Sequence, residues 1–311
     1  MENPAPAASG ADSYPFEPIV VNRPPLAARS TVKVVSLNAK GGRHLSGIID
    51  CLRKPPLNGA DVIFLCEAGW RHRLSGGHEV AAEIAAALGM SFAFEPQFAL
   101  PRVGGPPESF LGNAILSSRP LSEVRSVPLT HTIRARSIRR FIGTAAGVAA
   151  SAIFNGKSLA LGVAHLNSRG NPVGRELQMR EFLSKFSVDG PAIIGGDLNT
   201  TTVGLRNRDE MMRAVRQFLW QPRRLWAPQR WEPLFERLAE AGFKVDGANV
   251  PGQQTFGLVG IIPPPLRLKL DWIALRGLQP VPGSAAVRPA RLSLFGPRLS
   301  DHDFIVCDTR I

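Results

Sequence analysis

One segment places the tightest constraint on how this chain can fold. Residues 193–200 form an apolar run that stops at two glycines and then presents a carboxylate and a carboxamide two residues apart. Side chains at i and i+2 of an extended chain share a face, so Asp197 and Asn199 are predicted to point together from the end of a buried strand. One can accept a proton, and the other can donate a hydrogen bond to an anionic oxygen. The alternative is a Gly-Gly turn with an Asx cap that opens a helix.

Five further segments repeat this pattern. Four are apolar runs that end in or contain one hydrogen-bonding or ionisable side chain, and the fifth places an acid and an imidazole side by side before another apolar run. In chain order they are residues 34–38, 61–67, 161–167, 269–273 and 300–304. One such segment means little, but six together predict strands that converge on a common polar site.

The order of elements favours one large domain. The polar strand ends are spread over most of the 311 residues, and 44% of the residues are hydrophobic, which is enough for a substantial core. Residues 1–30, rich in Pro, Ala and Ser, are predicted to form a disordered tail, and residues 31–311 a single domain. Strands are predicted over 32–38, 61–66, 91–95, 112–117, 121–128, 143–154, 157–165, 191–196, 270–275 and 303–309, helices over 44–53, 79–88, 174–186, 208–219 and 231–241, and loops over 260–266 and 279–289. Hairpins mixed with helices indicate mixed sheets, not a regular βαβ alternation.

The series Asn38, Glu67, His165, Asp197 with Asn199, Asp271, and Asp301 with His302 resembles the endonuclease/exonuclease/phosphatase superfamily. The matching order spans residues 32 to 308, and the Gly-Asp-Leu-Asn and Ser-Asp-His motifs are fairly specific together. Cys66 stands where the family often has Gln, and Ser36-Leu37 where it often has an aromatic residue before the Asn. The resemblance implies an α/β (α+β) four-layer sandwich: two mixed, mostly antiparallel β-sheets packed face to face and flanked by helices. It also implies a metal-dependent phosphoric ester hydrolase.

Phosphodiester hydrolysis needs an activated water, neutralised phosphate oxygens and a stabilised leaving group. A hard divalent ion held by carboxylates supplies part of each, so we expect Mg²⁺, with Mn²⁺ as a substitute. Glu67 is the first choice of metal ligand. Asn38 would ligate the ion or orient Glu67, and Asp301 is a further candidate ligand.

The remaining polar residues receive catalytic roles. Asp197 is predicted to be the general base or to orient the attacking water, and Asn199 to donate to the phosphate as charge develops. His302 is expected at the phosphate or near that water, with Asp271 fixing its tautomer and charge. His165 is assigned to a phosphate contact, although a strand-end histidine is often only a structural residue. The proton donor to the leaving group is left open between His165 and a metal-bound water.

Charge points to the substrate class. Lys and Arg number 37 against 25 acidic residues, a net charge of +12, which favours polyanionic partners. Arginines alternate over 134–140, and the stretch 206–231 interleaves seven arginines with Trp220, Trp226 and Trp231. This mixture suits single-stranded nucleic acid. It equally suits peripheral contact with an anionic membrane, and those tryptophans could also simply pack a helix onto a sheet. We therefore expect a nuclease, with a phospholipid or sphingomyelin phosphodiesterase or an inositol phosphate phosphatase as the alternative.

The remaining features bound the setting. Cys51, Cys66 and Cys307 lie within apolar patterns and are expected to be buried free thiols, which fits a reducing cytoplasm. The first 30 residues do not resemble a secretory signal, and no uninterrupted apolar run reaches the roughly 18 residues of a membrane span. We expect a cytoplasmic monomer. A catalytically dead binding scaffold would have lost a metal-binding or base residue, and no such loss is visible.

Overall fold

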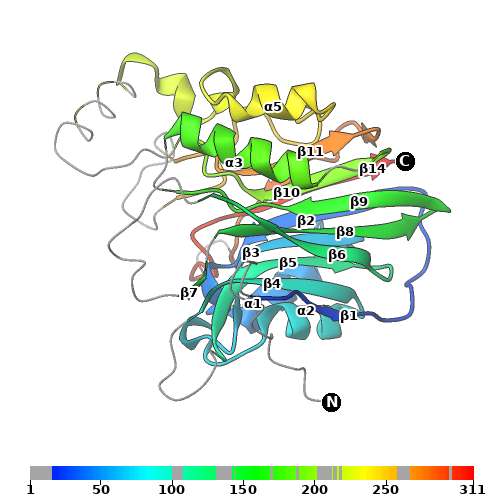
Figure 1. Ribbon diagram of the computed structural model, residues 1–311. Coiled ribbons are helices and arrows are strands. Elements are labelled where there is room, and N and C mark those ends of the chain that lie inside the picture. Colours follow the sequence, from blue (N-terminus) through cyan, green and yellow to red (C-terminus); the bar gives the residue numbers. More distant parts are fainter. Residues whose placement is uncertain are drawn as a thin grey trace.

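Four layers of secondary structure make up the fold, as the computed structural model shows (Figure 1). The structure describes residues 16–99, 108–130, 142–143, 145–168, 171–186, 189–201, 212, 216, 219–257, 267–293 and 296–311. Two sheets pack face to face at the centre, and helices cover the outer face of each. This arrangement confirms the predicted fold class.

The larger sheet contains nine strands among the described residues. Their order is β1 (Ile19–Val21), β4 (Ser91–Ala99), β5 (Phe110–Ser117), β3 (Val62–Trp70), β2 (Val32–Asn38), β14 (Phe304–Arg310) and β12 (Gln279–Pro280), with β13 (Ala286–Arg288) also on β14 and β7 (Ile142–Gly143) on β4. Strands β2 and β3 are parallel, and the other described pairs of this sheet are antiparallel.

The smaller sheet has five strands in the order β11 (Asp271–Arg276), β10 (Ala192–Asp197), β9 (Lys157–Val163), β8 (Ala146–Phe154) and β6 (Ser122–Pro128). A hairpin turn at Asn155-Gly156 joins β8 to β9, with Phe154 paired to Lys157. Both turn residues have positive φ, 50° and 76°, as a two-residue hairpin turn of this kind requires. Only β9 and β10 run parallel among the described pairs of this sheet.

Helices α1 (Leu45–Leu52) and α2 (Val80–Leu88) cover the larger sheet, and α3 (Pro172–Lys185) and α5 (Leu234–Glu240) cover the smaller one. Helix α2 ends at Gly89, which takes the left-handed conformation typical of a helix C-terminus. Among the described residues, four short 3-10 helices join the elements: η1 (Lys40–Gly42), η2 (Arg73–Ser75), η4 (Pro222–Leu225) and η5 (Pro228–Arg230).

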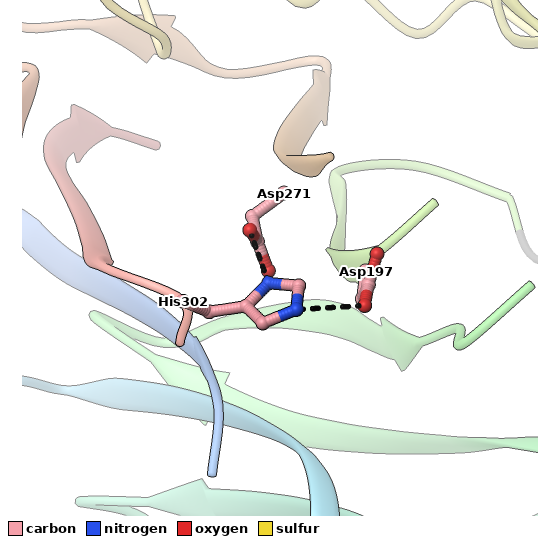
Figure 2. Close-up of side chains that lie close together, drawn as sticks. All are labelled: Asp197, Asp271 and His302. Atoms are coloured by element: carbon pink, nitrogen blue, oxygen red, sulfur yellow. Dashed lines mark hydrogen bonds and ion pairs between the residues drawn. The ribbon is translucent and has the colours of Figure 1, made fainter. Parts of the chain in front are cut away.

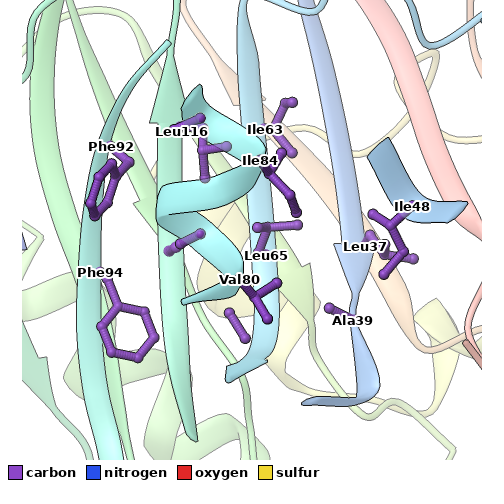
Figure 3. Packing of buried hydrophobic residues seen from close by; sticks show 14 of the residues in the cluster. Leu37, Ala39, Ile48, Ile63, Leu65, Val80, Ile84, Phe92, Phe94 and Leu116 are labelled. Atoms are coloured by element: carbon purple, nitrogen blue, oxygen red, sulfur yellow. The ribbon is translucent and has the colours of Figure 1, made fainter. Parts of the chain in front are cut away.

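Alternation along each strand fills the spaces between the layers. In β3, Ile63 and Leu65 face helix α2, where Val80 and Ile84 pack (Figure 3), whereas the intervening Phe64 belongs to the cluster between the two sheets. Because both faces of β3 are buried, its sequence is a nearly continuous apolar run and not an alternating one. The core therefore fixes the register of the strands whose ends carry the polar residues.

Two expectations from the sequence need correction, and several others fall on residues that the structure does not describe. The tail predicted over 1–30 is wrong for 16–21, because Phe16 is buried in the core and β1 pairs with β4. The stretch 279–289, predicted as a loop because of its prolines, contributes β12 and β13, whose short pairings lie at the sheet edge where proline is tolerated. Residues 1–15, the basic stretch 134–140, the loop 260–266 and all but residues 212, 216 and 219 of the predicted helix 208–219 are not described.

Two glycines allow close backbone approach beside the polar strand ends. A Cβ atom on Gly195 would lie 2.2 Å from Cδ2 of Phe64, so the two sheets meet there without room for a side chain. Gly196 has a φ of +136°, and a Cβ atom on it would lie 2.1 Å from the carbonyl oxygen of Ala164. The Gly-Gly pair therefore lets β10 approach both neighbours just before Asp197.

Candidate active site

The polar strand ends meet at one end of the two packed sheets. Asn38 ends β2 and Asp197 ends β10. Strand β11 runs antiparallel to β10, and its first residue, Asp271, pairs in register with Asp197. His302 lies just before β14, which is antiparallel to β2, so it too reaches this end. Chain segments up to 262 residues apart are joined here, since the Ser300 hydroxyl donates to the Asn38 carbonyl at 2.7 Å.

An imidazole lies between two buried carboxylates. Nδ1 of His302 is 2.8 Å from Oδ2 of Asp271, and Nε2 of the same ring is 3.6 Å from Oδ2 of Asp197 (Figure 2). The contact with Asp271 is a hydrogen bond, whereas the distance to Asp197 is too long for one. Nε2 therefore points toward Asp197 with its donor capacity available for a third group.

The charges of Asp271, His302 and Asp197 are set by burial and by their mutual interactions. Burial opposes a charged His302, but the carboxylates of Asp271 and Asp197 outweigh that effect and raise the pKa of His302 to about 10. The ring is thus an imidazolium at neutral pH. Burial raises the pKa of Asp197, although His302 counteracts it, so this carboxyl is a stronger base than an exposed aspartate.

Asn38 joins Glu67 to Asp197. Its side-chain Nδ2 donates to Oε1 of Glu67 at 3.2 Å and to Oδ2 of Asp197 at 3.0 Å. His165 completes the group, with Nε2 3.6 Å from Oδ2 of Asp197 and 4.0 Å from Oε1 of Glu67. Oδ2 of Asp197 is therefore the atom on which Asn38, His165 and His302 all converge.

Glu67 owes its direction to a β-bulge. The pairing of β3 with β5 slips between Leu65 and Ala68, and Glu67 there has a φ of 51°, which is rare for a residue with a side chain. The glutamate side chain is 37% exposed, unlike the buried Asp197. The bulge therefore places one carboxylate at the mouth of the site.

Asp301 and Asn199 are committed to contacts within the protein. Oδ2 of Asp301 is 2.8 Å from Nζ of Lys40, and although burial acts the other way, hydrogen bonding to Lys40 lowers the pKa of Asp301. Nδ2 of Asn199 donates to the Leu166 carbonyl at 2.8 Å, while its backbone N–H donates to Oδ1 of Asp197 at 3.0 Å. Asn199 thus orients the Asp197 carboxylate.

Several supporting residues could not be assigned from the sequence. The Thr255 hydroxyl accepts hydrogen bonds from the backbone N–H groups of Leu270 and Asp271, each at 3.0 Å, and the Phe256 ring lies 4.8 Å from the His302 ring. Both residues come from an irregular stretch that carries no motif. The Ser-Asp-His motif did contain a signal for Ser300, whose hydroxyl also accepts from the His302 backbone at 3.2 Å.

Cys66, a departure from the family pattern, lies where the two sheets meet. Its Sγ accepts from the backbone N–H of Asp197 at 3.4 Å and contacts the carbonyl of Ala164 at 3.7 Å. Burial raises the pKa of the Cys66 thiol well above its usual range, so the group stays neutral. Cys51 and Cys307 are also buried and free.

The arrangement fits a hard divalent ion at its mouth. Ligand atoms of Asp197, Asp271 and His302 lie within 4.8 Å of one another, but a protonated imidazole has no lone pair to offer a metal. The carboxylate of Glu67 is the accessible oxygen donor, and the Asn38 contact sets it beside Asp197. Such oxygen donors are the ligands that Mg²⁺ and Mn²⁺ prefer.

Two packed sheets thus carry a buried carboxylate–imidazole pair at one end, with the carboxylate of Glu67 beside it. A model of the Endonuclease/Exonuclease/phosphatase family matches residues 35–302. The chain belongs to this family, whose members are metal-dependent phosphoric ester hydrolases.

Solved structures show the same fold at low sequence identity. An endonuclease/exonuclease/phosphatase from Beutenbergia cavernae is 18% identical over 91% of this chain and 72% of its own, with a TM-score of 0.60. D. rerio TDP2, complexed with a single strand DNA product, is 18% identical over 91% and 100%, with a TM-score of 0.56. Sphingomyelinase C from Streptomyces griseocarneus is 15% identical over 90% and 99%, with a TM-score of 0.51. No curated protein matches the sequence.

Among the described residues, no helix has the length and apolar character needed to cross a membrane.

Proposed function

We propose that this protein is a Mg²⁺-dependent phosphodiester hydrolase that cleaves nucleic acid. The observation that carries the proposal is the row Asp271–His302–Asp197, with Asn38 and Glu67 beside it. A phosphodiester carries one negative charge, and a buried imidazolium next to a basic carboxylate provides a cation for the phosphate and a proton acceptor for water.

Each residue has a defined task in this proposal. Asp197, fixed by the backbone of Asn199 and by Asn38, accepts the proton of the attacking water. His302, held by Asp271, donates from Nε2 to a phosphate oxygen. His165 contacts the phosphate from the other side of Asp197. Asn199 is predicted to donate to the phosphate in addition to its contacts within the protein.

The divalent ion would be held by Glu67, with Asn38 and Asp301 as neighbouring donors. When bound it would neutralise phosphate charge and stabilise the leaving oxygen. Asp301 already forms an ion pair of 2.8 Å with Lys40 through Oδ2, so the ion would share this carboxylate with Lys40 or displace the lysine. Lys40 is half exposed and has room to move away.

Nucleic acid is favoured as substrate by charge. The net charge of +12 attracts a polyanion over its whole length, whereas a single headgroup needs only the site itself. One observation favours the lipid alternative: Leu219 and Trp220 are 74% and 82% exposed, as expected of side chains that insert into a membrane interface.

A substrate panel tests the proposal. Purified protein is incubated with plasmid DNA, abasic-site duplex, single-stranded DNA, RNA, sphingomyelin vesicles and inositol phosphates, each with Mg²⁺, with Mn²⁺ and with a chelator. Nucleic acid cleavage that needs the ion and stops with the chelator is the expected result. Release of headgroup without any nicking would establish the lipid alternative and overturn the proposal.

A further inference from the structure

A recess lies along the smaller sheet, outside the strand-end site. It has a volume of about 880 Å³ and is lined by η4, η5, α5 and residues 243–252. We call it the β11 cleft. The side chains that matter for its chemistry are Arg223, Trp226, Arg230, Trp231, Lys244 and Asp246.

The β11 cleft follows its strand away from the active site. At the site end, the backbone N–H of Lys269, two residues before Asp271, donates to the carbonyl of Leu225 in η4. At the other end, Lys244 exchanges two backbone hydrogen bonds with Leu275. The walls of the cleft are therefore attached to both ends of β11, a span of roughly 15–20 Å at about 3.3 Å per residue.

The lining combines ring faces with cations. Trp226 and Trp231 are half-buried, above a floor that includes the buried Phe235 and Phe243. The guanidinium of Arg224 lies 5.8 Å from the Trp231 ring centroid, a cation–π contact that holds this ring in place.

The charged groups around these rings are mostly positive. Arg223, Arg230 and Lys244 are exposed, and Asp246 is the acidic group among the lining residues. The cleft thus presents aromatic surface and an excess of positive charge together.

We propose that the β11 cleft binds a single-stranded segment of the nucleic acid substrate. Bases stack on Trp226 and Trp231, and phosphates lie at Arg223, Arg230 and Lys244. Stacking on a ring face requires an unpaired base, which selects single strands over duplex. The inference rests on the proposed function, because the nucleic acid bound in the cleft would be the same molecule whose phosphodiester is cleaved beside Asp271.

The recess fits nucleic acid better than a membrane. Tryptophans that anchor a protein at a lipid surface project outward to headgroup level, as the exposed Trp220 does. Trp226 and Trp231 instead lie in a hollow that a flat bilayer would not fill.

Binding is measured without turnover, in a chelator, by fluorescence anisotropy of labelled dodecamers of deoxythymidine and of uridine. Trp226→Ala with Trp231→Ala is expected to weaken binding at least about tenfold, because two bases lose the ring faces on which they stack. Trp220→Ala is the matched control and should change binding by less than about twofold. Trp226→Phe with Trp231→Phe should restore most of the affinity, which separates stacking from a folding defect.

The salt dependence of the same binding tests the cations. In the double variant Arg223→Glu with Arg230→Glu, the slope of log affinity against log salt concentration should become shallower by one or more. Each phosphate contact contributes about 0.7 to that slope for a single strand. The control, Lys157→Glu with Arg310→Glu, changes the net charge by the same amount. Both residues are exposed and lie at the strand ends away from the active site, so the slope should stay nearly unchanged. Equal slopes in the two double variants would overturn the proposal.

Hydrolysis of a small aryl phosphodiester separates this inference from the proposed function. Cleft variants that hydrolyse it normally but lose oligonucleotide binding support the cleft. Wild-type oligonucleotide affinity in the double tryptophan variant overturns the proposed role of the cleft and leaves the proposed active site unaffected.

Absence of hydrolysis of any phosphodiester overturns the proposed function alone. Anionic vesicles that displace the oligonucleotide from the wild type but bind the double tryptophan variant poorly would reassign the cleft to lipid and overturn the inference.

Discussion

Asp271 holds His302 by a 2.8 Å hydrogen bond to Nδ1, which leaves Nε2 directed at Asp197 from 3.6 Å. Because Nδ1 carries the proton of that bond, the reactive nitrogen is Nε2. The two aspartates are cross-strand neighbours in register, so a single cation keeps their charges from repelling each other.

Removing either member of the imidazole pair should stop most turnover. His302→Ala and Asp271→Asn are each expected to lower kcat on the preferred substrate by at least about a hundredfold, because the phosphate loses a positioned cation. Steady-state kinetics with saturating Mg²⁺ measures the loss. In Asp271→Asn, the His302 pKa should also fall from about 10, as an NMR titration of the ring in the metal-free protein would show. Full activity in either variant contradicts the assignment.

Asp197→Asn should also lower kcat at least about a hundredfold, since a carboxamide cannot accept the proton of the attacking water. The matched control is Asp308→Asn in β14, at the strand end opposite to His302, where activity should be unchanged. A loss of similar size in both variants would indicate a general effect on folding and remove the support for Asp197 as the base.

The stability of the metal-free protein should fall as pH rises from 6.5 to 8. His302 has a pKa of about 10 in the folded state and 6.5 ordinarily, so the folded state binds more protons in this window. The stabilisation is complete below 6.5 and is lost as pH rises through 10. Above about 8 the buried Lys269, whose pKa burial lowers from 10.5 to about 8, contributes the opposite slope. Urea unfolding of wild type and His302→Gln at pH 6.5, 7 and 8 measures the difference, which vanishes if His302 is neutral.

Gly196→Ala should cost about 3 kcal/mol of unfolding free energy or more, because the added methyl meets the Ala164 carbonyl oxygen at 2.1 Å and the φ of +136° is strained. Gly283→Ala provides the control, since Gly283 also has a positive φ but open space around it. It should cost only about 1 kcal/mol. Equal losses on denaturant unfolding would show that close approach at Gly196 is not the cause.

Glu232→Gln should destabilise the protein by about 3–5 kcal/mol. Glu232 and Arg175 form a fully buried, two-pronged ion pair at 2.6 and 3.0 Å, and loss of one charge leaves the other buried without compensation. The exposed pair Arg237–Glu240 has the same 2.6 Å contact, yet Glu240→Gln should cost at most about 1 kcal/mol. Thermal or urea unfolding of both variants distinguishes them.

Sequence patterns predicted most of the fold because the burial of each strand face determines where apolar residues occur along the strand. The two-sided burial of β3 and the Asn155-Gly156 turn are local signals, so their elements appear close to the predicted limits. Edge strands β12 and β13 were missed because they are short, and their pairing with β14 is decided by tertiary contacts. The segment 16–21 was missed for the same reason.

The predicted site residues are brought together, but their precise relations were not visible in the sequence. The strand alternation from which Asn199 was assigned ends at Asp197, and the positive φ of 49° at Asn199 directs its amide to the Leu166 carbonyl. Lys40 and Thr255 support the site from positions without a motif. The bulge that turns Glu67 outward depends on the pairing of β3 with β5, which no single strand encodes.

The pairing of β2 with β14 has a consequence for biosynthesis. Asn38 emerges early from the ribosome and His302 hundreds of residues later, yet the reaction centre needs both. Under the proposed function, a nascent chain therefore has no hydrolytic activity until β14 has docked, so the appearance of activity would report completed folding.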